Sequence, residues 1–169
     1  AVLLAGVLLT SAASLTADVR TEQKTLVKFE GMLGRMVNMF GGKAETPVVI
    51  RAMCGAGFRA AAQHSQMLTP LFTHIPGLKV LAPGTLEDAR WMLAAALADP
   101  NPVLIFEHIV LYNAEGELDP AVTAVDIRHA KVRRPGRDLS LVTYGNSLPK
   151  CLAAAEADAL HDASLAPEL

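Results

Sequence analysis

The chain has 169 residues, of which 51% are hydrophobic and 19% are charged, and its formal net charge at pH 7 is −2. This length suits one domain with part of a second. A net charge near zero removes the long-range attraction to nucleic acid and to anionic membranes, so neither is expected as a partner. The high apolar fraction indicates a large core or a subunit interface, and we favour the interface. Cys54 and Cys151 match no zinc or redox spacing and predict free thiols.

Residues 1–17 form an apolar stretch followed by small residues, which resembles the hydrophobic region of a secretory signal. The stretch begins with Ala, has no basic leader and is too short to span a membrane. We therefore expect a small-residue helix packed inside an α/β domain. A secreted or membrane-associated product is the alternative.

Apolar residues recur at helical spacing over residues 26–40, and Gly41 with Gly42 supplies a stop, which predicts a helix. Short apolar runs at residues 46–52, 78–82 and 102–106 predict buried strands. The Ala-rich segment 86–98 predicts a helix, with Thr85 as its N-cap and Asp88 three residues further on. Because strand, helix and strand follow one another through short joins, the sequence predicts an α/β fold with a mostly parallel sheet flanked by helices.

Polar and charged residues dominate residues 112–138. Their basic cluster could bind phosphate or belong to a solvated linker, and we favour the linker. The basic residues of this segment are Arg128, His129, Lys131, Arg133, Arg134 and Arg137. A strand at residues 139–143 and a helix through residues 153–155 predict a partial second α/β domain. The expected division is therefore a partial first domain at 1–111, a linker at 112–138 and the start of a second domain at 139–169.

Two segments carry a family resemblance: PGLKVLAPGTLEDARWMLAAALADPNPVLIFEH at residues 76–108 and AQHSQ at residues 62–66. They resemble the β subunit of the decarboxylating component of 2-oxoacid dehydrogenases, which acts on pyruvate, acetoin or branched-chain oxoacids. The resemblance extends over about residues 26–160. It implies a transketolase-like pyrimidine-binding domain, the beginning of the family's carboxy-terminal domain, and a chain that corresponds to a middle piece of the family's β subunit.

The resemblance also implies a function. It indicates thiamine-diphosphate-dependent oxidative decarboxylation of a 2-oxoacid, with pyruvate as the expected substrate, and acyl transfer to a lipoyl group. The implied partners are an α subunit that shares the cofactor, a second β subunit and the lipoyl acyltransferase core. The implied location is the cytoplasm, or the mitochondrial matrix in a eukaryote.

His64 is the candidate catalytic residue. An imidazole titrates near neutrality and can donate or accept a proton beside a reacting carbonyl. His64 follows a strand and a glycine-containing loop, and ligand sites in open parallel sheets gather beyond the carboxyl ends of strands. The resemblance implies a role for His64 in proton handling or acyl transfer. Ser65 lies outside any nucleophile elbow and is expected to form hydrogen bonds or a cap.

A structural potassium ion is a second implication of the resemblance. Its ligands would come from Val48, Ala96, Leu97, Asp99 and Asn101. Most contacts would be backbone carbonyls, which are hard oxygen ligands. From the residues alone, the Asp-Pro-Asn segment is an ordinary helix-terminating turn. Glu107 and His108, at a strand end, are expected to form a structural ion pair or hydrogen bond.

The sequence departs from the family at two places. The glutamate that activates the cofactor's aminopyrimidine is not found, because Glu22 and Glu30 lack the family's Glu-Ala-Gly context. No cofactor-binding residue is therefore assigned. Arg51-Ala52-Met53-Cys54 also differs from the family's usual proline-containing text and is expected to reshape the loop that bears His64. A non-catalytic remnant that keeps the subunit-interaction surface is the alternative function.

Overall fold

The computed structural model describes residues 32, 34–35, 39–41, 43, 45–57, 59, 61–161 and 167–168. The expectations for residues 1–17 lie outside this range, as does most of the helix expected at 26–40. The described residues Met32, Gly34, Arg35 and Met39 are helical, and Phe40 and Gly41 form the expected turn. Gly41 has a φ of 62°, in the left-handed region that favours glycine.

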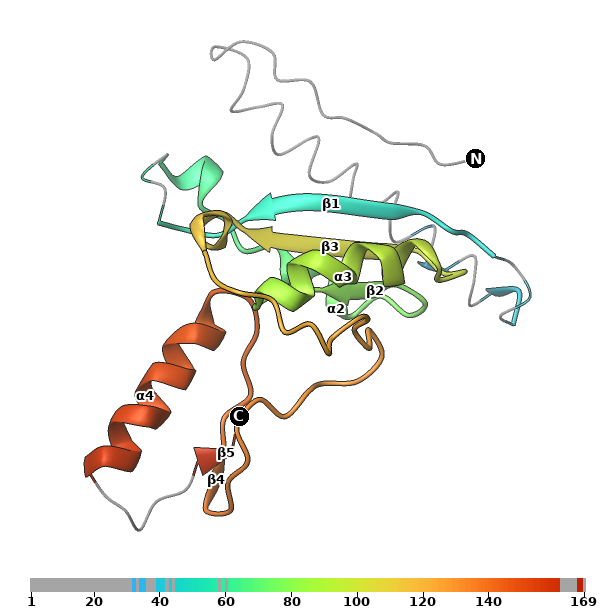
Figure 1. Cartoon of the computed structure of the whole chain (residues 1–169). Helices are drawn as coiled ribbons and strands as arrows, with labels where there is room; N and C mark the ends of the chain where they lie inside the picture. The colour runs from blue at the N-terminus through green and yellow to red at the C-terminus, as the bar shows by residue number, and fades with distance from the viewer. Residues whose placement is uncertain are drawn as a thin grey trace.

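A parallel sheet of three strands forms the body, with the order β1-β3-β2 (Figure 1). The strands are β1 (Val49–Cys54), β2 (Lys79–Leu81) and β3 (Val103–His108). The register places Val49 and Lys79 on either side of Val103. All three strands were expected, and their parallel arrangement is confirmed. β1 extends beyond the predicted end because Met53 and Cys54 continue the pairing with Glu107 and His108.

The sheet is covered on both faces, as is typical of parallel sheets. Successive residues of β3 point to opposite faces. Leu104 and Phe106 pack in one cluster with Phe72 of α2 (Thr69–Thr73), whereas Val103 and Ile105 pack in the other with Ala96 of α3 (Leu86–Leu97). The four β3 residues are at most 3% exposed. This central strand therefore joins the two halves of the core.

Helix α3 begins with a complete capping box. The Thr85 hydroxyl accepts a hydrogen bond from the Asp88 N–H at 3.2 Å, and the Asp88 carboxylate accepts one from the Thr85 N–H at 3.2 Å. These bonds satisfy backbone donors that a helix end would leave unpaired. The N-cap expected at Thr85 is confirmed.

Further secondary structure follows residues 112–138. Strand β4 (Leu139–Ser140), helix α4 (Ser147–His161) and strand β5 (Pro167–Glu168) succeed one another, and β4 pairs with β5 in parallel. β4 is shorter than the strand expected at 139–143, because its described pairing with β5 joins only Leu139 to Pro167 and Ser140 to Glu168. Helix α4 extends away from the main sheet as an arm (Figure 1).

Both cysteines are free, as expected. Within the described part of the chain, no helix combines the length and the apolar character needed to cross a membrane.

Candidate functional site

The loop that follows β1 presents His64 at the carboxyl edge of the sheet. His64 ends the 3₁₀ turn η1 (Ala62–His64), and its side chain is exposed. Two hydrogen bonds hold the turn to Ala61: the His64 N–H donates to the Ala61 carbonyl at 3.3 Å, and the Ser65 hydroxyl donates to the same oxygen at 2.8 Å. The hydrogen-bonding role expected for Ser65 is confirmed.

The backbone of this loop is strained at Ala61. Its φ of 62° and ψ of −178° lie in a region that is almost restricted to glycine. Strain of this kind costs on the order of 1–3 kcal/mol and persists only where neighbouring contacts hold it. The bonds that His64 and Ser65 make to the Ala61 carbonyl are such contacts.

An ion pair and a tyrosine join the ends of β1 and β3. Arg51 donates from Nε to Oε1 of Glu107 at 2.7 Å, and the Tyr112 hydroxyl donates to Oε2 at 2.8 Å. Burial, and then the hydrogen bond to Glu107, raises the pKa of Tyr112 to about 12, so the phenol keeps its proton at neutral pH. Tyr112 belongs to the turn η2 (Ile109–Asn113), which Glu107 thereby ties to the sheet. The structural role expected for Glu107 is confirmed.

The expected potassium ligands lie near the amino-terminal ends of the strands, whereas His64 lies beyond their carboxyl ends. Val48 precedes β1, Ala96 and Leu97 end α3, and Asp99 and Asn101 precede β3. Two backbone hydrogen bonds bring these segments together: the Thr46 N–H donates to the Pro100 carbonyl at 2.9 Å, and the Val103 N–H donates to the Val48 carbonyl at 2.8 Å. The structure therefore gathers the five residues at one corner.

Several oxygen atoms at this corner already accept hydrogen bonds. The Val48 carbonyl has the Val103 N–H, and the Ala96 carbonyl has the N–H groups of Ala98 and Asp99. The Asp99 carboxylate pairs with the Lys79 ammonium and accepts from the Asn101 N–H at 2.9 Å. A cation would therefore use the remaining lone pairs of the carbonyls, beside a positive charge that Lys79 already supplies.

The Lys79–Asp99 pair predicts a loss of stability in acid. Burial raises the pKa of Asp99, but hydrogen bonds from Lys79 and Asn101 outweigh it, so the pKa lies below the ordinary value of 3.8. The pKa of Asp99 is lower in the folded chain than in the unfolded chain. The stabilisation that ionised Asp99 gives the folded chain is therefore complete above pH of about 4, and it disappears as the pH falls through the folded pKa. Lys79→Met should lower the free energy of unfolding at pH 7 by about 2–3 kcal/mol, because Asp99 stays buried without its partner.

Urea unfolding between pH 2.5 and pH 7 measures this effect. Lys79→Met should show a shallower decline in acid than the wild type. The exposed Lys43 provides the matched control, and Lys43→Met should follow the wild-type curve. Equal acid dependence of the Lys79 variant and the wild type would rule out the pair as its source.

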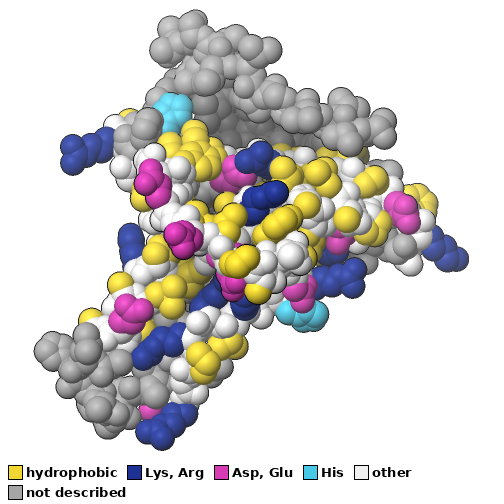
Figure 2. All heavy atoms as spheres, viewed as in Figure 1, with side chains coloured by type: hydrophobic (Ala, Val, Ile, Leu, Met, Phe, Trp, Pro, Cys, Tyr) yellow, Lys and Arg dark blue, Asp and Glu magenta, His cyan; other side chains and the backbone are white. Residues whose placement is uncertain are grey.

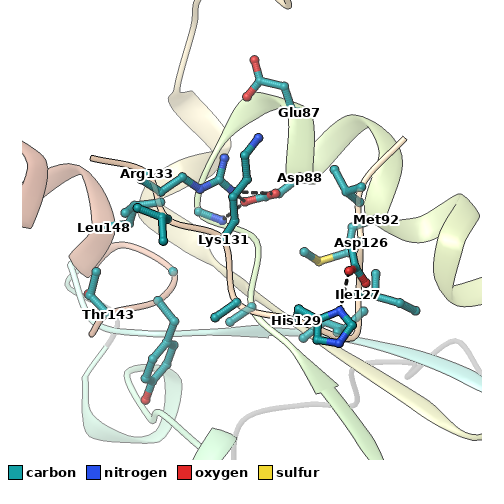
Figure 3. Close-up of a pocket in the computed structure, with 18 of the residues that line it drawn as sticks. Glu87, Asp88, Met92, Asp126, Ile127, His129, Lys131, Arg133, Thr143 and Leu148 are labelled. Carbon is teal, nitrogen blue, oxygen red and sulfur yellow. Dashed lines mark hydrogen bonds and ion pairs between the residues drawn. The ribbon is translucent and has the colours of Figure 1, made fainter. Parts of the chain in front are cut away.

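A hollow of about 870 Å³ lies between α3, residues 122–133 and the segment that leads into α4 (Figure 3). Arg133 spans it and donates from Nη2 to both carboxylate oxygens of Asp88 at 3.0 Å. The Arg133 side chain is only 20% exposed, so the expectation of a solvated position is wrong for this residue. Ile127 of the same segment packs against the core cluster under α3. Residues 112–138 are therefore attached to α3 and to the core cluster beneath it.

Among the contacts that sequence reasoning missed are Arg133 with Asp88, Tyr112 with Glu107, and Gly55 with His108. A Cβ atom at Gly55 would lie 2.2 Å from Nε2 of His108, so the imidazole occupies the space that a side chain would need. The sequence indicated one of these contacts, that of Gly55 with His108, because Cys54-Gly55-Ala56-Gly57 places glycines directly after a strand. The other two contacts join residues whose spacing carries no periodic signal.

An open parallel sheet with polar side chains beyond its carboxyl ends defines an α/β domain of the ligand-binding kind. The family described as the transketolase pyrimidine-binding domain matches residues 33–114. A relative from Cupriavidus necator, named acetoin:2,6-dichlorophenolindophenol oxidoreductase subunit beta, is 59% identical over 117 residues, which are 69% of this chain and 35% of the relative. The pyruvate dehydrogenase E1 subunit beta of Rhizobium meliloti is 43% identical over 125 residues, which are 72% of this chain and 27% of the relative.

A solved structure titled split gene transketolase, inactive beta4 tetramer, superposes with a TM-score of 0.58 at 21% identity, covering 73% of this chain and 39% of that one. The likeness confirms the transketolase-like fold. Residues 33–114 therefore carry a transketolase-type pyrimidine-binding domain, and the chain is homologous over about 70% of its length to β subunits of 2-oxoacid dehydrogenase E1 components. It spans about a third of the length of the curated relatives it matches.

The family includes thiamine-diphosphate enzymes, whose cofactor would need a carboxylate beside its pyrimidine at the carboxyl ends of the strands. Glu107 lies at these carboxyl ends, but its carboxylate is ion-paired with Arg51 and accepts a hydrogen bond from Tyr112, so it already joins η2 to the sheet. Glu107 therefore does not fit the activating role. The exposed imidazole of His64 does fit a role in holding or moving a proton.

Proposed function

We propose that the chain acts as a β-subunit component of a thiamine-diphosphate-dependent dehydrogenase, together with an α subunit. The observation that carries the proposal is the 59% identity to a β subunit whose name specifies acetoin. Acetoin is therefore the substrate to test first, and pyruvate, expected from the sequence, is the second. When bound, the cofactor provides a nucleophilic carbon for breaking a bond beside a carbonyl. The carboxylate that activates it would have to come from a residue other than Glu107.

Within this function, His64 would exchange a proton with the substrate or with an acyl intermediate. Two properties support the role: the side chain is exposed, and the hydrogen bonds from the His64 N–H and the Ser65 hydroxyl to the Ala61 carbonyl hold its turn in one conformation. A neutral imidazole can accept a proton and its conjugate acid can return it. We also propose transfer of the acyl product to a lipoyl group on an acyltransferase core.

The proposed partners are the α subunit and a second β subunit. Large apolar side chains are exposed at several places, among them Met53 at 60%, Leu97 at 52% and Val142 at 95%. Apolar side chains reach the surface on both the body and the α4 arm in Figure 2. Contact with other subunits would cover such groups. The proposed location is the cytoplasm, or the mitochondrial matrix in a eukaryote.

Replacement of His64 tests its catalytic role. In a complex with the α subunit, thiamine diphosphate and Mg²⁺, His64→Ala should reduce kcat on the order of 10²-fold to 10⁴-fold, the usual contribution of a positioned acid or base. The assay is reduction of 2,6-dichlorophenolindophenol with acetoin and then with pyruvate. His74→Ala is the control, because His74 is also exposed but caps α2 at a distance in sequence from the loop. An unchanged kcat in His64→Ala would exclude the role.

We further propose that a potassium ion binds at the corner formed by Val48, Ala96, Leu97, Asp99 and Asn101. The support is that these residues share one corner and that the Val48 carbonyl there accepts a single hydrogen bond, which leaves it a lone pair for a cation. If the ion binds the folded chain only, 100 mM KCl should raise Tm by roughly 2–4 °C over choline chloride at equal ionic strength. Identical melting curves in the two salts would refute the site.

The alternative function is a non-catalytic remnant that retains the subunit-interaction surface. The engagement of Glu107 by Arg51 and Tyr112 favours it, because this carboxylate has a structural role within the chain. The two functions differ in one outcome: a remnant would bind the α subunit without supporting turnover.

A further inference from the structure

We propose that His108 is a positioning residue that fixes the loop carrying His64 at the carboxyl edge of the sheet. The proposal rests on the proposed function of His64. It concerns a residue that does not itself meet the substrate. It follows from three contacts of the loop after β1, one of which closes the loop on itself.

The first contact is the packing of the His108 imidazole against Gly55. The ideal Cβ position of Gly55 lies 2.2 Å from Nε2, 2.3 Å from Cδ2 and 2.7 Å from Cε1 of His108. Gly55 is buried and has a φ of 93°, which L side chains rarely adopt. The ring therefore sits directly on the backbone where the loop leaves β1.

The second contact closes the loop at the same point. The Gly55 N–H donates to the Gln66 carbonyl at 3.0 Å, so residues 55–66 form a loop whose two ends are hydrogen-bonded together. His64 lies near the returning end of this loop. A shift of Gly55 would be passed through this bond to Gln66 and then to the turn η1.

The third contact repeats the arrangement two residues further along. A Cβ atom at Gly57 would lie 2.6 Å from Cγ2 of Val110, and Gly57 has a φ of 120°. Two alternate glycines of the loop thus meet two alternate residues: His108, which ends β3, and Val110, which lies in the turn η2. This spacing allows the loop to lie flat against the strand end.

The His108 ring is itself held in place. Its Nδ1 accepts a hydrogen bond from the Val110 N–H at 3.3 Å, which requires a ring nitrogen without a proton. Burial, and then the charge of Lys150, lowers the pKa of His108 and keeps the ring neutral. Pairing of His108 with Cys54 in the sheet register fixes its backbone beside Gly55.

Steady-state kinetics of the complex with the α subunit test the proposal. His108→Ala should lower kcat on the order of 10-fold to 100-fold, because misplacing a catalytic group by about 1 Å can cost that much, while KM changes less than about twofold. His108→Asn should recover most of kcat, since the Asn oxygen can still accept from the Val110 N–H. His74→Ala should match the wild type. A wild-type kcat in His108→Ala would overturn the proposal.

A second readout does not depend on turnover. In the chain labelled with ¹³Cε1-histidine, the His64 signal, assigned from its loss in His64→Ala, should shift or broaden in His108→Ala and return in His108→Asn. The His74 signal should stay in place. If the wild type is inactive, the proposed function fails, and this spectrum alone decides the positioning role. An unaltered His64 signal in His108→Ala would overturn that role.

A fold-preserving variant covers the case in which His108→Ala does not fold. His108→Leu fills the space above Gly55 but cannot accept from the Val110 N–H. It should keep the cooperative unfolding transition and show the same displaced His64 signal. A His64 signal identical to the wild type in His108→Leu would overturn the proposal.

Discussion

Asp88→Ala should lower the free energy of unfolding by about 2–4 kcal/mol. The carboxylate of Asp88 accepts from the N–H groups of Gly84 and Thr85, and loss of such a cap costs about 1 kcal/mol. The same carboxylate holds Arg133 through two bonds of 3.0 Å. Because Asp88 is 6% exposed and the Arg133 side chain 20% exposed, the substitution also leaves a largely buried guanidinium unpaired.

Denaturation of two further variants separates the cap from the ion pair. Thr85→Ala should cost about 1 kcal/mol, because it removes the hydroxyl part of the cap alone. A double-mutant cycle of Asp88→Ala with Arg133→Met should show a coupling energy of about 1–3 kcal/mol. A cost below about 0.5 kcal/mol for Asp88→Ala would mean that neither interaction stabilises the folded chain.

Phe106→Ala should lower the free energy of unfolding by about 3–5 kcal/mol, the cost of a large cavity in a packed core. Phe106 is 3% exposed, and its ring centroid lies 5.4 Å from that of Phe72, which is 1% exposed. The pair joins β3 to α2 in the core cluster beneath the sheet. Removal of the ring would therefore weaken the strand that leads into Glu107 and His108.

Urea unfolding again provides the measurement, with matched controls. Phe106→Leu should cost less than about 1.5 kcal/mol, because the apolar volume is mostly kept. Phe40 is 58% exposed, so Phe40→Ala should change the stability by less than about 0.5 kcal/mol. Similar costs for the Phe106 and Phe40 substitutions to Ala would contradict the assignment of Phe106 to the core.

Local patterns predicted the elements of the main sheet. The β-branched and apolar runs gave β1, β2 and β3, because short buried strands need little else to be recognised. The N-cap at Thr85 was predictable because a capping box has fixed spacing. The limits of β1 were missed at Met53 and Cys54, since their place in the sheet depends on pairing with Glu107 and His108 rather than on their own propensity.

Contacts between distant segments were not predictable. Arg133 reaches Asp88 across 45 positions, and Arg51 reaches Glu107 across 56. In the sequence, Arg133 is one basic residue among several, and only the folded chain selects it. The candidate site shows the same limit. His64 and the proposed potassium ligands were both suggested by the family resemblance, but the sequence alone did not indicate that they lie at opposite edges of the sheet.

Dye reduction by the reconstituted complex tests the proposed function most directly. The chain and the α subunit from the same organism would be mixed with thiamine diphosphate, Mg²⁺ and acetoin, and reduction of 2,6-dichlorophenolindophenol followed. Our account predicts turnover that requires both chains and the cofactor. Stable co-elution of the two chains without turnover of either acetoin or pyruvate would contradict it and would identify the chain as a binding remnant.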